Sequence, residues 1–417
     1  MITLIKNKIQ GNIGELVYLL GQYSTPIVSF LINTLVMRYI APETLGIHQS
    51  IMLWTSYLSF LQLGVFNGLN RNLAYYKGAN EEEKLRKASS TGFVFSFCVS
   101  VVSIIIVILI YNTSSDDQYS EISFLAYVLL GLTVFTQPII TFFDTLYRTG
   151  QDFKKLGGFI STNNAIYLAN SLLMFFFGYV GFVIQSAIKL AIALILRTHK
   201  KIFFLRVKFS KNSFKEQITT GFPILLNSYL SSTFFIFDQF YITHNFDKIE
   251  LGYYNLARLV LFIIPVIPNS LTTIFYPKAS TLYGKSGKNK QVLKPFFVKS
   301  LLINLLIVFP LIGLVYITIE PVVNLFLPKY VSGIEYAKAS VLGGLGYIFV
   351  GPSVILGVLK SNKINFVLLA GLSTSTYGLY FINILEFGSI INLIYYKNLL
   401  FIGYSIFMIC YVYYKIK

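Results

Sequence analysis

The 417-residue sequence is poor in charged residues, and the few that it has are mainly basic. Asp, Glu, Lys and Arg together make up 12% of it, whereas an ordinary soluble domain carries about 25%. Hydrophobic residues account for 55%, and the mean hydropathy is +0.66. This balance excludes a soluble globular protein and indicates a multi-pass membrane protein whose surroundings are a lipid bilayer.

Cysteine and histidine are also scarce. The two cysteines, Cys98 and Cys410, fall within apolar runs, which argues against a disulfide framework or a metal cluster. The three histidines are scattered, without a metal-binding spacing. The run Gly284–Ser286 resembles the end of a phosphate-binding loop, but Ala279 stands where that motif requires a glycine. We therefore expect no metal, no cofactor and no nucleotide site.

The net charge of +17 reflects loop composition rather than nucleic-acid binding. Most of the Lys and Arg residues lie in alternate loops between apolar runs, as in cytoplasmic loops that face anionic lipid. The opposite loops contain only Lys248, Lys329 and Lys338. This asymmetry requires an even number of spans and predicts that both termini are cytoplasmic. No nucleic-acid partner is expected.

Twelve apolar runs are close to the roughly 20 residues that a membrane-spanning helix needs. The predicted fold class is therefore all-α and integral to the membrane, with twelve transmembrane helices. The predicted spans are Gly14–Ile40, His48–Asn70, Thr91–Tyr111, Ile122–Tyr147, Gly158–Phe177, Val180–Leu196, Ile218–Thr243, Tyr253–Tyr276, Phe296–Ile319, Ala339–Leu359, Asn365–Leu385 and Ser389–Tyr414.

The most basic loop lies midway along the chain and divides it into two lobes of six helices. We predict an N-terminal lobe over residues 1–196, a basic cytoplasmic linker over 197–217 and a C-terminal lobe over 218–417. A weak internal repeat supports the division, because Leu45-Gly46 recurs as Leu251-Gly252, 206 residues later. Transporters built from such parallel repeats bind their substrate where the repeats meet.

Two ionisable residues lie within the apolar runs that open the second lobe, Asp238 and Arg258. A charge at the centre of a membrane helix costs about 2.5–3.5 kcal/mol, so charges kept there usually face a protein interior or a watery cavity. Arg258 either lines a central cavity and binds an anionic group such as a diphosphate, or forms an ion pair with Asp238. Asp238 is better interpreted as a structural partner than as a proton carrier.

Three further cations complete the set of candidate substrate-binding residues. Arg38 ends the first span and either lines the cavity or reaches the interface and pairs with Glu43. Lys189 lies in the middle of its span and is a cavity candidate. Lys397, two turns into the last span, either contacts substrate or anchors the helix at the interface. No catalytic residue is predicted.

Other polar residues within the spans are interpreted as structural. Asp144 is expected to pair with Arg148, one helical turn further on. Asn163, Asn164 and Asn170 of the fifth span are expected to hold helices together.

The order and spacing of several short motifs resemble one family. These motifs are Arg38–Gly46, Gly221–Pro223, Asp238, Leu251–Arg258 and Tyr276–Pro277. With the twelve-span topology, they make the chain similar to the polysaccharide repeat-unit flippases of the O-antigen and capsule type (Wzx-like). These flippases belong to the MOP superfamily, which also contains the lipid II flippases and the MATE multidrug exporters.

The resemblance implies two six-helix lobes around a central cavity that works by alternating access. Its implied substrate is an undecaprenyl-diphosphate-linked oligosaccharide, moved across the bacterial inner membrane for O-antigen, capsule or teichoic-type polysaccharide synthesis. Arg258 matches a position where lipid II flippases also carry a cavity arginine. The implied partners are the glycosyltransferases and the polymerase of the same pathway.

Two other functions stay open. One is a cation-coupled exporter of drugs or other small molecules with the same fold. The other is a membrane-embedded glycosyltransferase or polymerase, which is disfavoured because the external loops are too short for a catalytic domain. We therefore expect a transporter that is not an enzyme.

Overall fold

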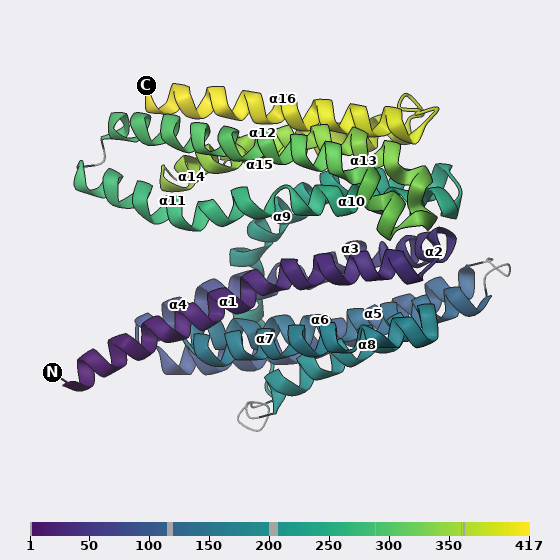
Figure 1. Ribbon diagram of the computed structural model, residues 1–417. Helices are drawn as coiled ribbons and strands as arrows, with labels where there is room; N and C mark the ends of the chain where they lie inside the picture. Colours follow the sequence, from purple (N-terminus) through teal and green to yellow (C-terminus); the bar gives the residue numbers. More distant parts are fainter. Residues whose placement is uncertain (1, 115–119, 200–206, 288, 360, 362) are drawn as a thin grey trace. The chain divides into compact units, whose positions relative to one another are not determined.

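The structure, a computed structural model, describes residues 2–114, 120–199, 207–287, 289–359, 361 and 363–417 (Figure 1). Helices make up nearly all of this part of the chain, and no strand occurs within it, which confirms the predicted all-α class. Eight segments of the described residues are long and apolar enough to cross a membrane. They correspond to all the predicted spans except the second, fifth, seventh and eleventh, so the count of twelve stays a prediction. The eight segments are Gly14–Tyr39, Glu82–Thr113, Glu121–Thr149, Leu172–Thr198, Lys248–Thr272, Lys290–Phe326, Pro328–Val358 and Ile390–Ile416.

The chain forms two compact units. Unit 1 contains residues 1–40 and 47–229, and unit 2 contains residues 41–46 and 230–417. The boundary between them lies inside a helix, after Tyr229, and a short segment near the N-terminus belongs to unit 2. Residues 200–206 of the predicted linker lie outside the described residues, and the division into two six-helix lobes stays a prediction.

Unit 1 is built on two helix pairs and a phenylalanine-rich core. Helix α1 packs along α7, and α5 packs along α6. Val65 and Leu69 of α4 are fully buried against Phe142 and Phe143 of α6. The elements of this part of the chain are α1 (Ile2–Tyr39), α2 (Pro42–Met52), α3 (Trp54–Leu58), the 3-10 helix η1 (Ser59–Gln62), α4 (Val65–Gly78), α5 (Glu82–Thr113), α6 (Ser120–Thr149), α7 (Phe153–Ala169), α8 (Leu172–Thr198) and the first part of α9 (Lys211–Asn245).

The second predicted span is not one continuous helix. It is divided into α2, α3, η1 and α4, and the chain turns at Leu63 and Gly64, whose φ angles are 48° and 75°. Glycine is required at the second of these positions for space as well as for its φ angle. A Cβ atom on Gly64 would lie 2.4 Å from the carbonyl carbon of Gly221 in α9. Hydrophobicity alone did not reveal this close approach of two backbones.

The turn between the fifth and sixth predicted spans lies earlier than expected. The sequence suggested a break at Gly178, but the helices separate at Asn170 and Ser171. These two polar residues form the turn, and α8 then begins with the apolar run that had been assigned to the fifth span. Gly178 interrupts α8 locally, with a φ angle of 53°.

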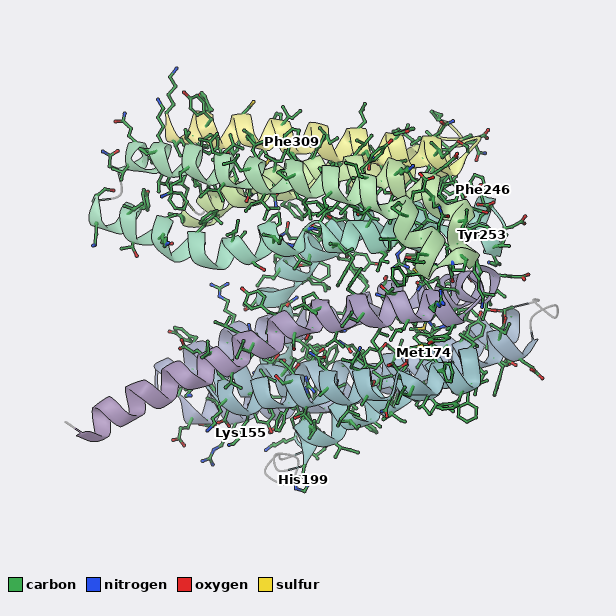
Figure 2. All side chains as sticks on the ribbon, in the orientation of Figure 1. Lys155, Met174, His199, Phe246, Tyr253 and Phe309 are labelled. Atoms are coloured by element: carbon green, nitrogen blue, oxygen red, sulfur yellow. The ribbon has the colours of Figure 1, made fainter. Side chains whose placement is uncertain are left out.

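The basic ends of the unit 1 helices lie together. Figure 2 shows Lys155 and His199 toward one end of this unit and Met174 toward the other. Near that basic end, Arg197 of α8 is buried and forms an ion pair with Asp144 of α6, at 2.5 Å between Nε and Oδ1. The expected pairing of Asp144 with Arg148 is therefore corrected, because Arg148 donates to the backbone carbonyl of Asp144 instead.

Unit 2 contains two hydrophobic cores along its helices. Phe237 and Tyr241 of α9 pack with Tyr254 of α10 in one core, and Phe297 of α12 packs with Met408 of α16 in the other. The eighth predicted span is divided between two helices, α10 and α11, which separate at Pro265, a residue that has no backbone N–H to donate. The elements are the rest of α9, α10 (Lys248–Ile263), α11 (Val266–Lys285), η4 (Lys290–Val292), α12 (Leu293–Phe326), η5 (Pro328–Gly333), α13 (Ile334–Val341), η6 (Leu342–Phe349), α14 (Val350–Val358), α15 (Lys363–Phe381) and α16 (Ile390–Ile416).

The repeated Leu-Gly pairs lie against each other in unit 2. A Cβ atom on Gly46 would be 1.7 Å from the carbonyl oxygen of Lys248, and one on Gly252 would be 1.8 Å from that of Pro42. Pro42 and Lys248 are separated by the same offset of 206 residues as the two glycines. The first turns of α2 and α10 therefore make two equivalent contacts, and each contact depends on a glycine.

Replacing Gly46 with alanine should destabilise the protein. The added methyl group overlaps a backbone oxygen that has no rotamer to change, so a loss of at least about 1–3 kcal/mol is expected. The thermal unfolding midpoint of the detergent-solubilised protein measures the effect, and Gly252→Ala should behave similarly. Gly371→Ala in α15 is the control, because nothing lies within 4 Å of its Cβ position. An unchanged midpoint in Gly46→Ala would contradict the contact.

Candidate functional site

The centre of the candidate site is the carboxylate of Asp238, on the part of α9 that belongs to unit 2. Its side chain is 4% exposed. One carboxylate oxygen, Oδ1, accepts the backbone N–H of Gln239 at 2.9 Å. The other, Oδ2, accepts the ammonium of Lys397 at 2.5 Å and the hydroxyl of Tyr254. Three helices, α9, α10 and α16, are thus joined through one side chain.

Lys397 is held in place by two acceptors. Its side chain is 11% exposed, and its ammonium donates to the backbone carbonyl of Phe235 at 2.7 Å as well as to Asp238. The carbonyl and the carboxylate lie one helical turn apart on α9, so the ammonium bridges them. This lysine lies two turns into α16 and inside the unit, which places it at the cavity.

Arg258 lines the same cavity, which has a volume of about 240 Å³. It lies on α10 one helical turn after Tyr254, and its Nη1 donates to the side-chain oxygen of Asn255 at 3.4 Å. The cavity wall therefore includes Arg258, Lys397 and Asp238. With two cations and one anion, the polar part of the cavity carries an excess of positive charge.

The remainder of the wall is mainly apolar and aromatic. The rings of Phe235 and Tyr347 each contact the ring of Phe401, with centroid distances of 5.2 and 5.1 Å. Asn398 lies on the wall as well, and its amide donates to the carbonyl of Ala339 at 2.8 Å. An apolar cavity with a few fixed polar groups is the usual form of a ligand site. The arrangement suits a ligand with an anionic group and flat or apolar surfaces.

The predicted site residues separate into two groups. Asp238, Arg258 and Lys397 come together around the unit 2 cavity. Arg38 and Lys189 belong to unit 1, where Arg38 is exposed at the end of α1. Substrate binding by these five residues stays a prediction. Asp238 bonds Lys397 in the structure, and Arg258 lines the same cavity, so the pairing of Asp238 with Arg258 stays a prediction.

Lys189 lies among polar residues of unit 1. Its ammonium is 4.0 Å from the centroid of the Tyr167 ring on α7. Gln185, one turn earlier on α8, donates to the backbone carbonyl of Tyr167 at 2.7 Å. Asn164 donates to the hydroxyls of Ser24 and Thr25 at 3.0 and 2.9 Å, which joins α7 to α1 as predicted for this asparagine.

Tyr254 was not identified by sequence reasoning. With Tyr330, it is one of the two largest fully buried side chains among the described residues, and its hydroxyl donates to Asp238. A signal for it was present, since Tyr254 lies one turn before Arg258 and therefore on the same face of α10. The pairing of Asp238 with Lys397 had no comparable signal, because 159 residues separate them.

The fold is that of the transporters of the MOP superfamily. The structure matches the inward-facing conformation of a multidrug resistance MATE family transporter with a TM-score of 0.70 and 14% identity, over 94% of each chain. It matches the outward-facing conformation of such a transporter with a TM-score of 0.64 and 14% identity, over 96% of this chain and 94% of the other. At this identity the matches define the fold alone.

A third solved structure adds a different kind of transporter with this fold. It is a MOP superfamily transporter from Pyrococcus furiosus Vc1, matched with a TM-score of 0.60 and 14% identity, over 98% of this chain and 95% of the other. For that protein, the reverse polarity of the binding pocket suggests a different function.

The sequence identifies the family of the chain. A family model described as polysaccharide biosynthesis protein matches residues 35–331, which is well over half of the chain. The chain therefore belongs to that family and is a multi-pass membrane protein, which confirms the family resemblance. The match includes Asp238, Tyr254 and Arg258, whereas Lys397 lies beyond it. A comparison with curated proteins gives no match.

The buried pair should be coupled energetically. Asp238→Asn or Lys397→Met alone leaves the partner charge buried without its counterion, at an expected cost of about 3–5 kcal/mol. The double variant removes both charges and should recover most of that stability. Thermal unfolding of the purified variants measures the coupling. A double variant that loses the sum of the two single effects would show that the pair is not coupled.

Proposed function

We propose that the protein is a flippase that moves undecaprenyl-diphosphate-linked oligosaccharide repeat units across the bacterial inner membrane. The observation that carries the proposal is the excess of positive charge in the unit 2 cavity, where Arg258 and Lys397 accompany the single acid Asp238. Membership of a polysaccharide biosynthesis family supports a glycan precursor as the substrate. The fold supports transport rather than synthesis.

Different residues of the cavity recognise different parts of such a substrate. The two cations Arg258 and Lys397 outnumber the one carboxylate, Asp238, so the cavity offers net positive charge to the diphosphate. A guanidinium presents several N–H donors in a planar fork that matches phosphate oxygens. The aromatic surfaces of Phe235, Tyr347 and Phe401 offer flat apolar faces to the sugars. The polyprenyl chain stays in the bilayer while the head group crosses by alternating access.

The proposed substrate determines the enzymes that act before and after the flippase. A lipid-linked repeat unit is assembled by glycosyltransferases on the cytoplasmic side. After crossing, it is joined to others by a polymerase on the outer side, for O-antigen, capsule or teichoic-type polymers. These enzymes are the proposed functional partners.

Export of drugs or other small molecules is the second candidate. It is favoured by the likeness in fold to multidrug resistance MATE family transporters. The charge of the cavity counts against cationic compounds, since an excess of positive charge repels them.

Deletion of the gene in its own host distinguishes the two candidates. The flippase proposal requires loss of surface polysaccharide together with accumulation of lipid-linked repeat units, and restoration of both by the intact gene. Expression in a pump-deficient host should leave drug susceptibility unchanged. Normal surface polysaccharide in the deletion strain, with acquired drug resistance in the second host, would establish export instead.

Arg258→Ala should abolish surface polysaccharide while the protein still reaches the membrane at a normal level. The reason is that removal of one of the two cations abolishes the excess of positive charge at the cavity. Arg258→Lys keeps the charge without the fork and should retain part of the activity. Arg148→Ala is the matched control, because Arg148 is exposed and its guanidinium donates to the backbone carbonyl of Asp144. Normal polysaccharide in Arg258→Ala would exclude the proposed role of this residue.

A further inference from the structure

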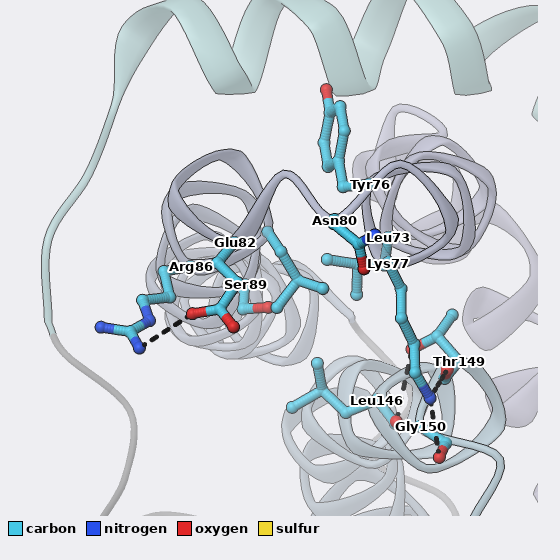
Figure 3. Close-up of a pocket in the computed structure, with 11 residues that line it drawn as sticks. Leu73, Tyr76, Lys77, Asn80, Glu82, Arg86, Ser89, Leu146, Thr149 and Gly150 are labelled. Carbon is cyan, nitrogen blue, oxygen red and sulfur yellow. Dashed lines mark hydrogen bonds and ion pairs between the residues drawn. The ribbon is translucent and has the colours of Figure 1, made fainter.

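A second cavity lies in unit 1, where the turn between α4 and α5 meets the end of α6 (Figure 3). Its volume is about 410 Å³, within the range of small-molecule sites. The walls combine the side chains of three leucines with a rim of polar residues. The lining residues are Leu73, Tyr76, Lys77, Asn80, Glu82, Leu85, Arg86, Ser89, Leu146, Thr149 and Gly150.

Lys77 spans the cavity from α4 to the end of α6. Figure 3 shows its side chain extended to the carbonyls of Thr149 and Gly150, to which the ammonium donates at 3.3 and 3.1 Å. An ammonium has three N–H donors, and these two described carbonyls use two of them. One donor is therefore left for an oxygen of a ligand. The two carbonyl contacts fix the position of the charge before any ligand binds.

Arg86 provides the second cation on the opposite side of the cavity. It pairs with Glu82 at 3.3 Å, and both side chains are exposed, 72% and 82% respectively. Ion pairs between exposed side chains contribute little to stability, because water screens both charges. A phosphate can therefore draw Arg86 away from Glu82 at little cost. It would form a charge-assisted contact with the guanidinium in return.

The position of this cavity indicates which phosphate would occupy it. Glu82 and Thr149, both on its wall, are terminal residues of two candidate membrane spans. The cavity therefore lies at the level where lipid head groups meet water. Leu73, Leu85 and Leu146 give it apolar walls, which suit the glycerol and first acyl carbons of a lipid better than a free anion. Basic pockets between membrane helices on the cytoplasmic side commonly bind anionic head groups.

We infer that this cavity, between Lys77 and Arg86, binds the phosphate head group of an anionic phospholipid from the cytoplasmic leaflet. The phosphate accepts the remaining donor of Lys77 and the guanidinium of Arg86. The leucines contact the upper part of the lipid. Such a lipid would tie α4, α5 and α6 together at their basic ends, independently of the substrate cavity in unit 2.

The test measures lipid-dependent stability of the full-length protein in detergent. Phosphatidylglycerol should raise the thermal unfolding midpoint of the wild type more than phosphatidylcholine does. Titration of the shift gives an apparent affinity for phosphatidylglycerol. Removing one surface cation weakens binding by about 1 kcal/mol, or about fivefold, so Arg86→Gln should weaken it about fivefold. Lys77→Gln combined with Arg86→Gln should weaken it about 25-fold.

The controls separate lipid binding from folding and from simple charge. Lys77→Gln removes the contacts to α6 and can lower stability by itself, so the comparison uses the difference between the two lipids for each variant. Lys285→Gln removes an exposed cation from α11 in unit 2 and should leave that difference unchanged. Equal effects of the two lipids on the wild type, or an unchanged difference in the double variant, would overturn the proposal. Glycerol phosphate matching the effect of phosphatidylglycerol would assign the cavity to a soluble anion and overturn it as well.

Discussion

The carboxylate of Asp238 sets the main constraint on unit 2. Within an apolar helical unit, a charged group is stable only where donors surround it. Here a backbone N–H, a tyrosine hydroxyl and an ammonium do so, and they come from three helices. Because this one carboxylate faces two cations, Lys397 and Arg258, an excess of positive charge remains at the cavity. The net charge of the cavity and the packing of α9, α10 and α16 therefore depend on the same interaction.

Sequence reasoning succeeded where the physical cause is local. Hydrophobic runs of sufficient length identified the helical class and eight segments that meet the criteria for membrane spans. The cost of charge in lipid directed attention to Asp238 and Arg258, and both line one cavity. In each case, a residue and its near neighbours in the sequence are sufficient to make the prediction.

Sequence reasoning failed where the cause is a partner far along the chain. Asp144 was expected to pair with Arg148, one turn away. Its carboxylate instead bonds the buried Arg197, which is 53 residues away in the sequence. The bond from Lys397 to Asp238 was not predicted, because 159 residues separate the two. The break at Gly64 reflects the backbone of α9, which approaches α4 too closely for a side chain. Helix periodicity contains no information on which distant helix packs against which face.

The membership of residues 41–46 in unit 2 has a consequence for how the protein is made. This segment leaves the ribosome roughly 200 residues before α10, which at about 5–20 residues per second is a delay of roughly 10–40 s. During that interval Gly46 has no Lys248 to pack against, so unit 2 is completed only late in synthesis. Residues 211–229, in turn, belong to unit 1 although they follow the basic loop. A cut in that loop would therefore leave each fragment without a part of its own unit.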